Sequence, residues 1–151
     1  MSVRHSATAI AAAAATALAL VAPANAAIVE NPITHEGTGA ITLEAVGSYD
    51  SGVFDASAAE IVSFHPGSQS ILTVNAASGQ IDVIDASEVT DLKLATSVRV
   101  AGHVINSVDV REDGLAVATA EPAADKTAPG KVVFFDANAP EDGILHEVAV
   151  G

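Results

Sequence analysis

The sequence predicts an all-β fold, an incomplete β-propeller of about two four-stranded antiparallel blades. The first observation is a series of short runs rich in Val, Ile and Phe, separated by turn residues, in Ala58–Ser87. The second is that this pattern recurs in Asn106–Ala137. The third is that a further β-prone run follows each copy. Four strands at a period of about fifty residues are typical of a propeller blade.

The first copy divides into four predicted strands. The first three strands are separated by turn-forming residues, Pro66-Gly67-Ser68 and Ala77-Ser78-Gly79. Short strands joined by such turns favour an antiparallel meander. The predicted strands are Glu60–Phe64, Ile71–Asn75, Gln80–Asp85 and Leu92–Val100.

The second copy aligns with the first in order. Gly79–Ala86 matches Gly130–Ala137, both ending in Asp-Ala, and Ile144–Val150 supplies the fourth strand. The matched strand positions are Val62 with Val108, Phe64 with Val110, and Ile71–Val74 with Leu115–Ala118. The alternative is that any two sets of apolar strands look alike.

Two of the predicted strands are apolar on both faces. Ile71–Val74 and Val132–Phe135 lack the alternation of polar and apolar residues that is typical of a strand with one solvent-exposed face. This pattern favours blades that pack face to face over a single half-exposed sheet.

The N-terminal segment predicts export. Residues 1–26 form a predicted signal peptide, with Arg4, an Ala-rich apolar stretch and Ala24-Asn25-Ala26 at the cleavage position. A membrane-spanning helix is the alternative, but the stretch falls short of the roughly 20 apolar residues it needs. We expect a flexible leader over 27–40 and a partial propeller over 41–151, with repeats at about 58–100 and 104–150. Ile41–Tyr49 is a predicted strand that completes a blade.

Composition excludes some partners. The formal net charge of -13, with only 6 scattered Lys and Arg, excludes nucleic acid as a natural partner. The mature chain contains no predicted transmembrane helix. Because the sequence has 0 Cys, core packing alone must hold the exported chain together.

The repeat alignment points to one candidate metal site. Glu60 and Asn106 fall at matching positions just before the inner strands, which line the channel of a propeller, and Asp55 precedes Glu60. Carboxylate and amide oxygens suit Ca²⁺ or Mg²⁺. The alternative is that Glu60 and Asn106 bond the backbone where strands begin. Asp82, Asp85 and Asp136 are assigned a structural role at turn amides.

Several runs resemble the choice-of-anchor I family. They are Gly52–Asp55, Ala58–Val62, Val74–Ala76, Ile81–Asp85, Val104–Val108 and Gly130–Asp136. The resemblance implies a secreted or surface-attached bacterial protein whose propeller is similar to YVTN and WD-repeat propellers. Members of the family are several times longer and end in an anchoring signal. We therefore expect this chain to be the N-terminal portion of such a protein.

Three functions remain open at this level. The first is an exported or cell-surface binding or scaffold module, favoured because no catalytic motif such as Gly-x-Ser-x-Gly is present. The second is a metal-dependent phosphoesterase with acidic residues at the channel mouth. The third is a non-functional truncated remnant. Expected partners are the missing blades, a second copy associating through exposed edges, or an unknown surface ligand.

Overall fold

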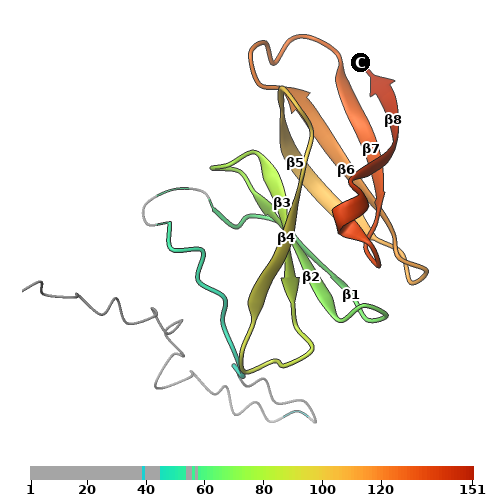
Figure 1. Ribbon diagram of the computed structural model, residues 1–151. Coiled ribbons are helices and arrows are strands. Elements are labelled where there is room, and N and C mark those ends of the chain that lie inside the picture. The colour runs from blue at the N-terminus through green and yellow to red at the C-terminus, as the bar shows by residue number, and fades with distance from the viewer. Residues whose placement is uncertain (1–38, 40–44, 54–55, 57) are drawn as a thin grey trace, which may run out of the picture.

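The computed structural model describes residues 39, 45–53, 56 and 58–151, and these form two antiparallel sheets (Figure 1). The first sheet has the order β1-β2-β3-β4 and the second the order β5-β6-β7-β8. The strands are β1 (Val62–His65), β2 (Ser70–Asn75), β3 (Gln80–Asp85), β4 (Lys93–Arg99), β5 (His103–Val110), β6 (Leu115–Pro122), β7 (Gly130–Asp136) and β8 (Ile144–Val150). The all-β prediction of two four-stranded blades is confirmed.

Little helix accompanies these strands. In the described part of the chain, one 3-10 turn, η1 (Pro140–Asp142), joins β7 to β8. No described helix is long and apolar enough to cross a membrane. The predicted signal peptide at 1–26 lies outside the described residues, as does the predicted leader over 27–40 apart from Gly39.

In each sheet, the residue after the third strand forms the same backbone hydrogen bond to the residue before the second strand. Ala86 N–H donates to Gln69 O at 2.8 Å, and Ala137 N–H donates to Gly114 O at 2.8 Å. Gln69 and Gly114 both have positive φ, at 52° and 93°, a region that glycine adopts with least strain. This equivalence makes Asp85 the counterpart of Asp136, as the sequence repeat predicted.

One part of the predicted alignment is off by one residue. Ser70 pairs with Asp85 and Leu115 pairs with Asp136, so Ile71 corresponds to Ala116 instead of Leu115. Hydropathy matched Ile71 with Leu115 because both are large and apolar. The backbone hydrogen bonds and strand registers instead match Ile71 with Ala116. The inner-strand match of Val62 with Val108 is confirmed by their pairing with Thr73 and Ala118, which are equivalent in this register.

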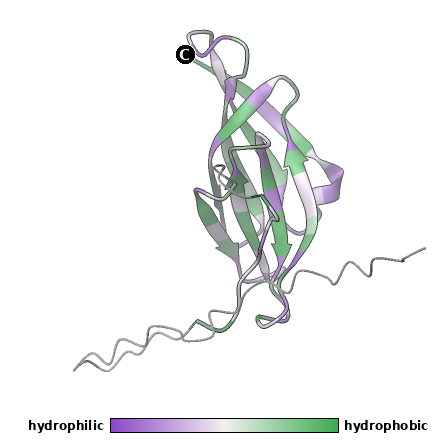
Figure 2. Ribbon diagram, turned by 90° about the vertical axis from the view of Figure 1, so that its left-hand side faces the viewer, coloured by the Kyte–Doolittle hydropathy of each residue, from purple (hydrophilic) through white to green (hydrophobic). Residues whose placement is uncertain are grey.

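A single hydrophobic core lies between the sheets. One face of the first sheet packs against one face of the second, and strand alternation places the contributing residues on these two faces. In Figure 2, hydrophobic segments run through the strands of both sheets. The buried cluster contains Leu72, Val74, Ile81, Val83 and Val98 from the first sheet and Val108, Ala116, Ala118, Val133 and Phe135 from the second.

The sheets stack head to tail. Phe135 and Ala118 of the second sheet face the core, but their counterparts Ile84 and Thr73 lie on the opposite, outer face of the first sheet. Each sheet therefore presents a different face to the shared core. This arrangement is that of successive propeller blades, which repeat by rotation in one direction.

The predicted strand at Ile41–Tyr49 is wrong over its described part. Residues 45–49 have no strand structure, and 41–44 lie outside the described residues. A Cβ atom added at Gly47 would lie 1.9 Å from Val89 O, so this segment passes directly over the β3–β4 connection. The described part of this segment thus lies against the β3–β4 connection and pairs with no strand.

Candidate functional site

Glu60 is exposed and lines a pocket beside the first sheet. Its N–H donates to Val74 O at 3.1 Å, which extends the β1–β2 pairing beyond the strand. The pocket has a volume of about 540 Å³, and Ser48, Tyr49, Asp50 and Ser51 also line it. Glu60 therefore forms a backbone hydrogen bond to β2 and also lines a shallow recess of mixed polar and apolar residues.

Asn106 has different neighbours. It lies in β5 at a bulge, where the register with β6 shifts between Ile105 and Ser107. Its side chain bonds Glu121, whose carboxylate also pairs with Lys126 at 2.6 Å. Lys126 first, and Asn106 second, lower the pKa of Glu121. Asn106 thus anchors the end of β6.

The predicted metal ligands are only partly placed. Asp55 lies outside the described residues, and the hydrogen bonds of Glu60 to Val74 and of Asn106 to Glu121 do not bring these two residues to one point. Among the described residues, no three His, Asp or Glu side chains form a group that could hold a metal ion. The Ca²⁺ or Mg²⁺ site at Asp55, Glu60 and Asn106 stays a prediction.

Equivalent inner-strand positions do meet elsewhere. Ser63 of β1 donates its hydroxyl to Asp109 Oδ1 of β5 at 2.9 Å. These two residues follow Val62 and Val108 directly and are counterparts in the repeat. The inner strands therefore lie side by side, as the blade alignment implies.

The first sheet also holds a buried carboxylate that the sequence reasoning assigned differently. Asp82 is 3% exposed, and its oxygens accept hydrogen bonds from Asn75 Nδ2 at 2.7 Å, Ser97 Oγ at 2.7 Å and Gln80 Nε2. The expected turn-amide role is wrong for Asp82, because it lies in the middle of β3. The role is confirmed for Asp85 and Asp136, which accept the N–H of Ser87 and Asn138.

A signal for this cluster was present in the sequence. Polar residues alternate with apolar ones in Gln80-Ile81-Asp82-Val83, which places Gln80 and Asp82 on one face of a buried strand. Buried polar groups require partners, so Asn75 and Ser97 on the neighbouring strands were predictable candidates once the strand order was known.

Tyr49, which lines the pocket, experiences the charge of this carboxylate. Burial, followed by the negative charges of Asp82 and Asp50, raises the pKa of the Tyr49 phenol above its ordinary value of 10.0. Both carboxylates, Asp82 and Asp50, disfavour the phenolate form of Tyr49 because like charges repel.

The Tyr49 titration is directly measurable, because the chain has 1 Tyr and 0 Trp. We expect phenolate absorbance to rise with a midpoint above 10.0, and the midpoint to move down toward that value in Asp82→Asn. Since the folded pKa is raised, the stability contributed by neutral Tyr49 is present below the unfolded pKa and is lost as pH rises through the folded one. An unchanged midpoint in Asp82→Asn would exclude the Asp82 charge as a cause.

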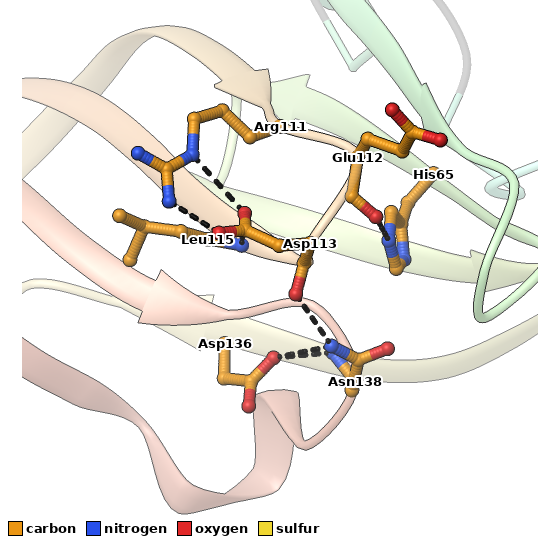
Figure 3. Close-up of polar contacts among 7 residues, drawn as sticks. All are labelled: His65, Arg111, Glu112, Asp113, Leu115, Asp136 and Asn138. Atoms are coloured by element: carbon orange, nitrogen blue, oxygen red, sulfur yellow. Dashed lines mark hydrogen bonds and ion pairs between the residues drawn. The ribbon is translucent and has the colours of Figure 1, made fainter.

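A buried histidine joins the two blades at their turns (Figure 3). His65 is 1% exposed, and its Nδ1 accepts from Ser68 N–H at 3.2 Å and contacts Ser68 Oγ at 2.8 Å. With Nδ1 accepting, Nε2 carries the proton and donates to Glu112 O at 3.2 Å on the β5–β6 turn. Because a backbone N–H of the same serine occupies Nδ1, this pair stabilises a turn and lacks the arrangement of a nucleophile and its base.

The β5–β6 turn is held by its own polar contacts. The Arg111 side chain pairs with Asp113, donating from Nε to Oδ1 at 3.1 Å and from the guanidinium to Oδ2. Asn138 Nδ2 donates to Asp113 O at 3.3 Å and to Asp136 Oδ1 at 2.9 Å (Figure 3). Arg111 follows Asn106 in the chain, and its charge is paired locally with Asp113.

Comparison with known proteins gives one result. The sequence profile of the Choice-of-anchor I domain matches residues 60–151, a span that contains every strand from β1 to β8. No curated protein and no solved structure matches the chain. The match covers more than half of the chain and agrees with the paired four-stranded sheets. The chain therefore belongs to the choice-of-anchor I domain family, a family of surface-associated, β-rich bacterial modules.

Proposed function

We propose that this chain is an exported binding or scaffold module of the bacterial cell surface. The observation that supports it most is the set of large apolar side chains exposed on the outer faces. On the first sheet, Val62, Phe64 and Leu94 are 65%, 53% and 45% exposed. On the second sheet, Val148 is 43% exposed on the face away from the core. Exposed apolar patches of this kind mark surfaces that contact other macromolecules.

The polar groups support binding over hydrolysis. A phosphoesterase needs a cation or a free basic group to hold phosphate. Arg111 is paired with Asp113, and Lys126 is paired with Glu121. The conspicuous buried polar groups, His65 and Asp82, are bonded to turns and neighbouring strands. These contacts favour a structural use of the polar side chains that the repeat brings together.

Export is the first measurable consequence. When the full chain is produced in a bacterial host, we expect the product outside the cytoplasm to begin at or near Ala27, because residues 1–26 have the composition of a signal peptide. Mass spectrometry of the N-terminus in each cell fraction measures this. Replacing the apolar Ala7–Ala22 stretch by a polar one of equal length is the control and should retain the product inside.

Surface retention separates the module from a secreted enzyme. Protease added to intact cells should degrade the product in the cell-bound fraction, and the culture medium should contain little of it. An exported product that still begins at Met1 or Ser2 would contradict the signal peptide. An exported product that hydrolyses an aryl phosphate when Ca²⁺ or Mg²⁺ is added, and loses this activity in Glu60→Gln, would contradict the binding-module function.

A further inference from the structure

We propose that the buried Asp82 cluster of the first sheet binds a monovalent cation with oxygen ligands, such as Na⁺. The cluster consists of Asp82 and the three side chains that donate hydrogen bonds to it, those of Asn75, Gln80 and Ser97. It lies on the outer face of the first sheet, over which the chain's own segment before β1 passes. The site is therefore internal to this chain and independent of the proposed function.

The first observation is the charge of Asp82. Its carboxylate is 3% exposed, and the three groups that donate hydrogen bonds to it are uncharged. Arg99 pairs with Gln80 in the β3–β4 register, but Arg99 is exposed. Buried charges in proteins are normally balanced by an opposite charge or by a metal ion, because their removal from water is costly. Neutral donors lower this cost without balancing the charge.

The second observation is a buried acceptor that lacks a donor. Gln80 is 7% exposed, and its amide turns Nε2 toward Asp82 Oδ1, because an ionised carboxylate only accepts hydrogen bonds. Nε2 also donates to Ser97 Oγ at 3.1 Å. The other end of the amide, Oε1, is buried, and no group of the described residues donates a hydrogen bond to it. Amide carbonyl oxygens are ligands for hard cations, so a cation here would satisfy Gln80 and balance Asp82 together.

The second sheet carries a cation of its own at the equivalent place. In the register that relates the two sheets, Lys131 is the counterpart of Gln80 and Glu147 is the counterpart of Ser97. Lys131 Nζ bonds Glu147 Oε2 at 2.6 Å. The second blade thus balances its carboxylate with a lysine ammonium, where the first blade has a neutral amide. An ion from solution would supply the same single positive charge to the first blade.

The ligand set selects a monovalent ion. One carboxylate balances one positive charge, whereas Ca²⁺ is usually held by several carboxylates. Within the part of the chain that the structure describes, no three His, Cys, Asp or Glu side chains gather to hold a metal. The other oxygens of the cluster are neutral, and neutral carbonyl oxygens are known to replace the hydration shell of a monovalent cation.

Thermal melting in two matched salts tests for the ion. The full chain should melt at a higher temperature in NaCl than in tetramethylammonium chloride, because an ion that binds only the folded state stabilises it by mass action. The expected difference is roughly 3–6 °C when Na⁺ is at about ten times its Kd. Equal ionic strength keeps the screening of the net charge of -13 the same in both salts.

Three variants locate the ion. Asp82→Asn removes the buried charge and should lose the difference between the two salts. Gln80→Lys places an ammonium beside Asp82, as Lys131 does beside Glu147, and should also melt at one temperature in both salts. Asp85→Asn removes an exposed carboxylate of the same strand, so it is the matched control and should keep the difference seen in the parent chain.

Tyr49 gives a second measurement that screening alone would not change. The charge of Asp82 contributes to the raised pKa of Tyr49, and a cation bound beside Asp82 would offset that charge. The midpoint of phenolate absorbance in the parent chain should therefore be lower in NaCl than in tetramethylammonium chloride at equal ionic strength. In Gln80→Lys the midpoint should be the same in both salts.

Two results would overturn the proposal. Equal melting temperatures of the parent chain in the two salts would show that the neutral donors and Arg99 suffice to hold Asp82. A difference that persists in Asp82→Asn and in Gln80→Lys would place the ion elsewhere on the acidic chain. If Asp82→Asn fails to fold by circular dichroism, Gln80→Lys decides alone, with salt-independent melting in support and parent-like salt dependence against.

Discussion

Replacing Phe135 by alanine is expected to reduce the free energy of unfolding by about 3–5 kcal/mol. Phe135 is 0% exposed and is the largest of the fully buried side chains among the described residues. It lies in the core shared by both sheets, between Ala116 on β6 and Ile144 on β8. Small neighbours such as Ala116 cannot fill the cavity. Domains of this kind are stable by only about 5–15 kcal/mol, so the loss is a large share of the total.

Denaturant unfolding followed by far-ultraviolet circular dichroism measures this loss, with all proteins at one concentration because association adds to apparent stability. Phe64→Ala is the matched control. Phe64 is 53% exposed, and its removal should change stability by no more than about 0.5 kcal/mol. Equal losses for the two variants would contradict the assignment of packed and outer faces.

Replacing Asp82 by alanine is expected to lower the free energy of unfolding by roughly 2–5 kcal/mol. The carboxylate is buried and accepts hydrogen bonds from Asn75, Gln80 and Ser97. Alanine removes the acceptor of the buried Asn75 amide and leaves Gln80 Nε2 with only Ser97 Oγ at 3.1 Å, and each orphaned buried group is costly. Asp85→Ala, which removes an exposed bond to Ser87 N–H, should cost about 1 kcal/mol and serves as the comparison.

The second sheet suggests a compensating variant. The counterparts of Asp82 and Asn75 are Val133 and Ala120, and both are buried without a polar group in the side chain. Asp82→Val combined with Asn75→Ala should therefore be more stable than Asp82→Ala, because the Asn75 donor is removed together with its acceptor and the valine side chain fills the space, while Gln80 and Ser97 can still bond each other. Thermal melting of the three proteins tests this order. A double variant less stable than Asp82→Ala would show that the cluster stabilises through more than satisfied hydrogen bonds.

Local sequence was sufficient for the strands and for some turn contacts. Runs rich in Val and Ile, separated by turn residues such as Gly, Pro and Asp, predicted the strands. Their order within each sheet followed, because neighbouring strands joined by short turns pair antiparallel. The match of Asp85 with Asp136 was also predicted, and both form the expected turn bonds. Each of these features depends on residues close together in the chain.

The candidate site was harder to predict. Glu60 and Asn106 align in the repeat, but their surroundings differ. Asn106 lies at a bulge in β5 and its side chain bonds Glu121. The Asp82 cluster was missed as a unit because its members come from β2, β3 and β4. Their proximity depends on the registers between strands, and a register is set by the whole ladder instead of any single run.

The sequence by itself determined that this chain forms two four-stranded sheets whose central strands are apolar on both faces. Only the tertiary structure decided which face is buried. Phe134 and Phe135 are adjacent and identical in chemistry, yet Phe135 is fully buried and Phe134 half-buried. Val62 and Val108 are repeat counterparts, yet one is 65% exposed and the other 4%. The physical reason is that burial depends on what packs on each face. The head-to-tail stack covers one face of each blade with the other sheet, and on the outer face of the first sheet Thr73 and Ile84 of the central strands are buried while Val62 at the edge is exposed.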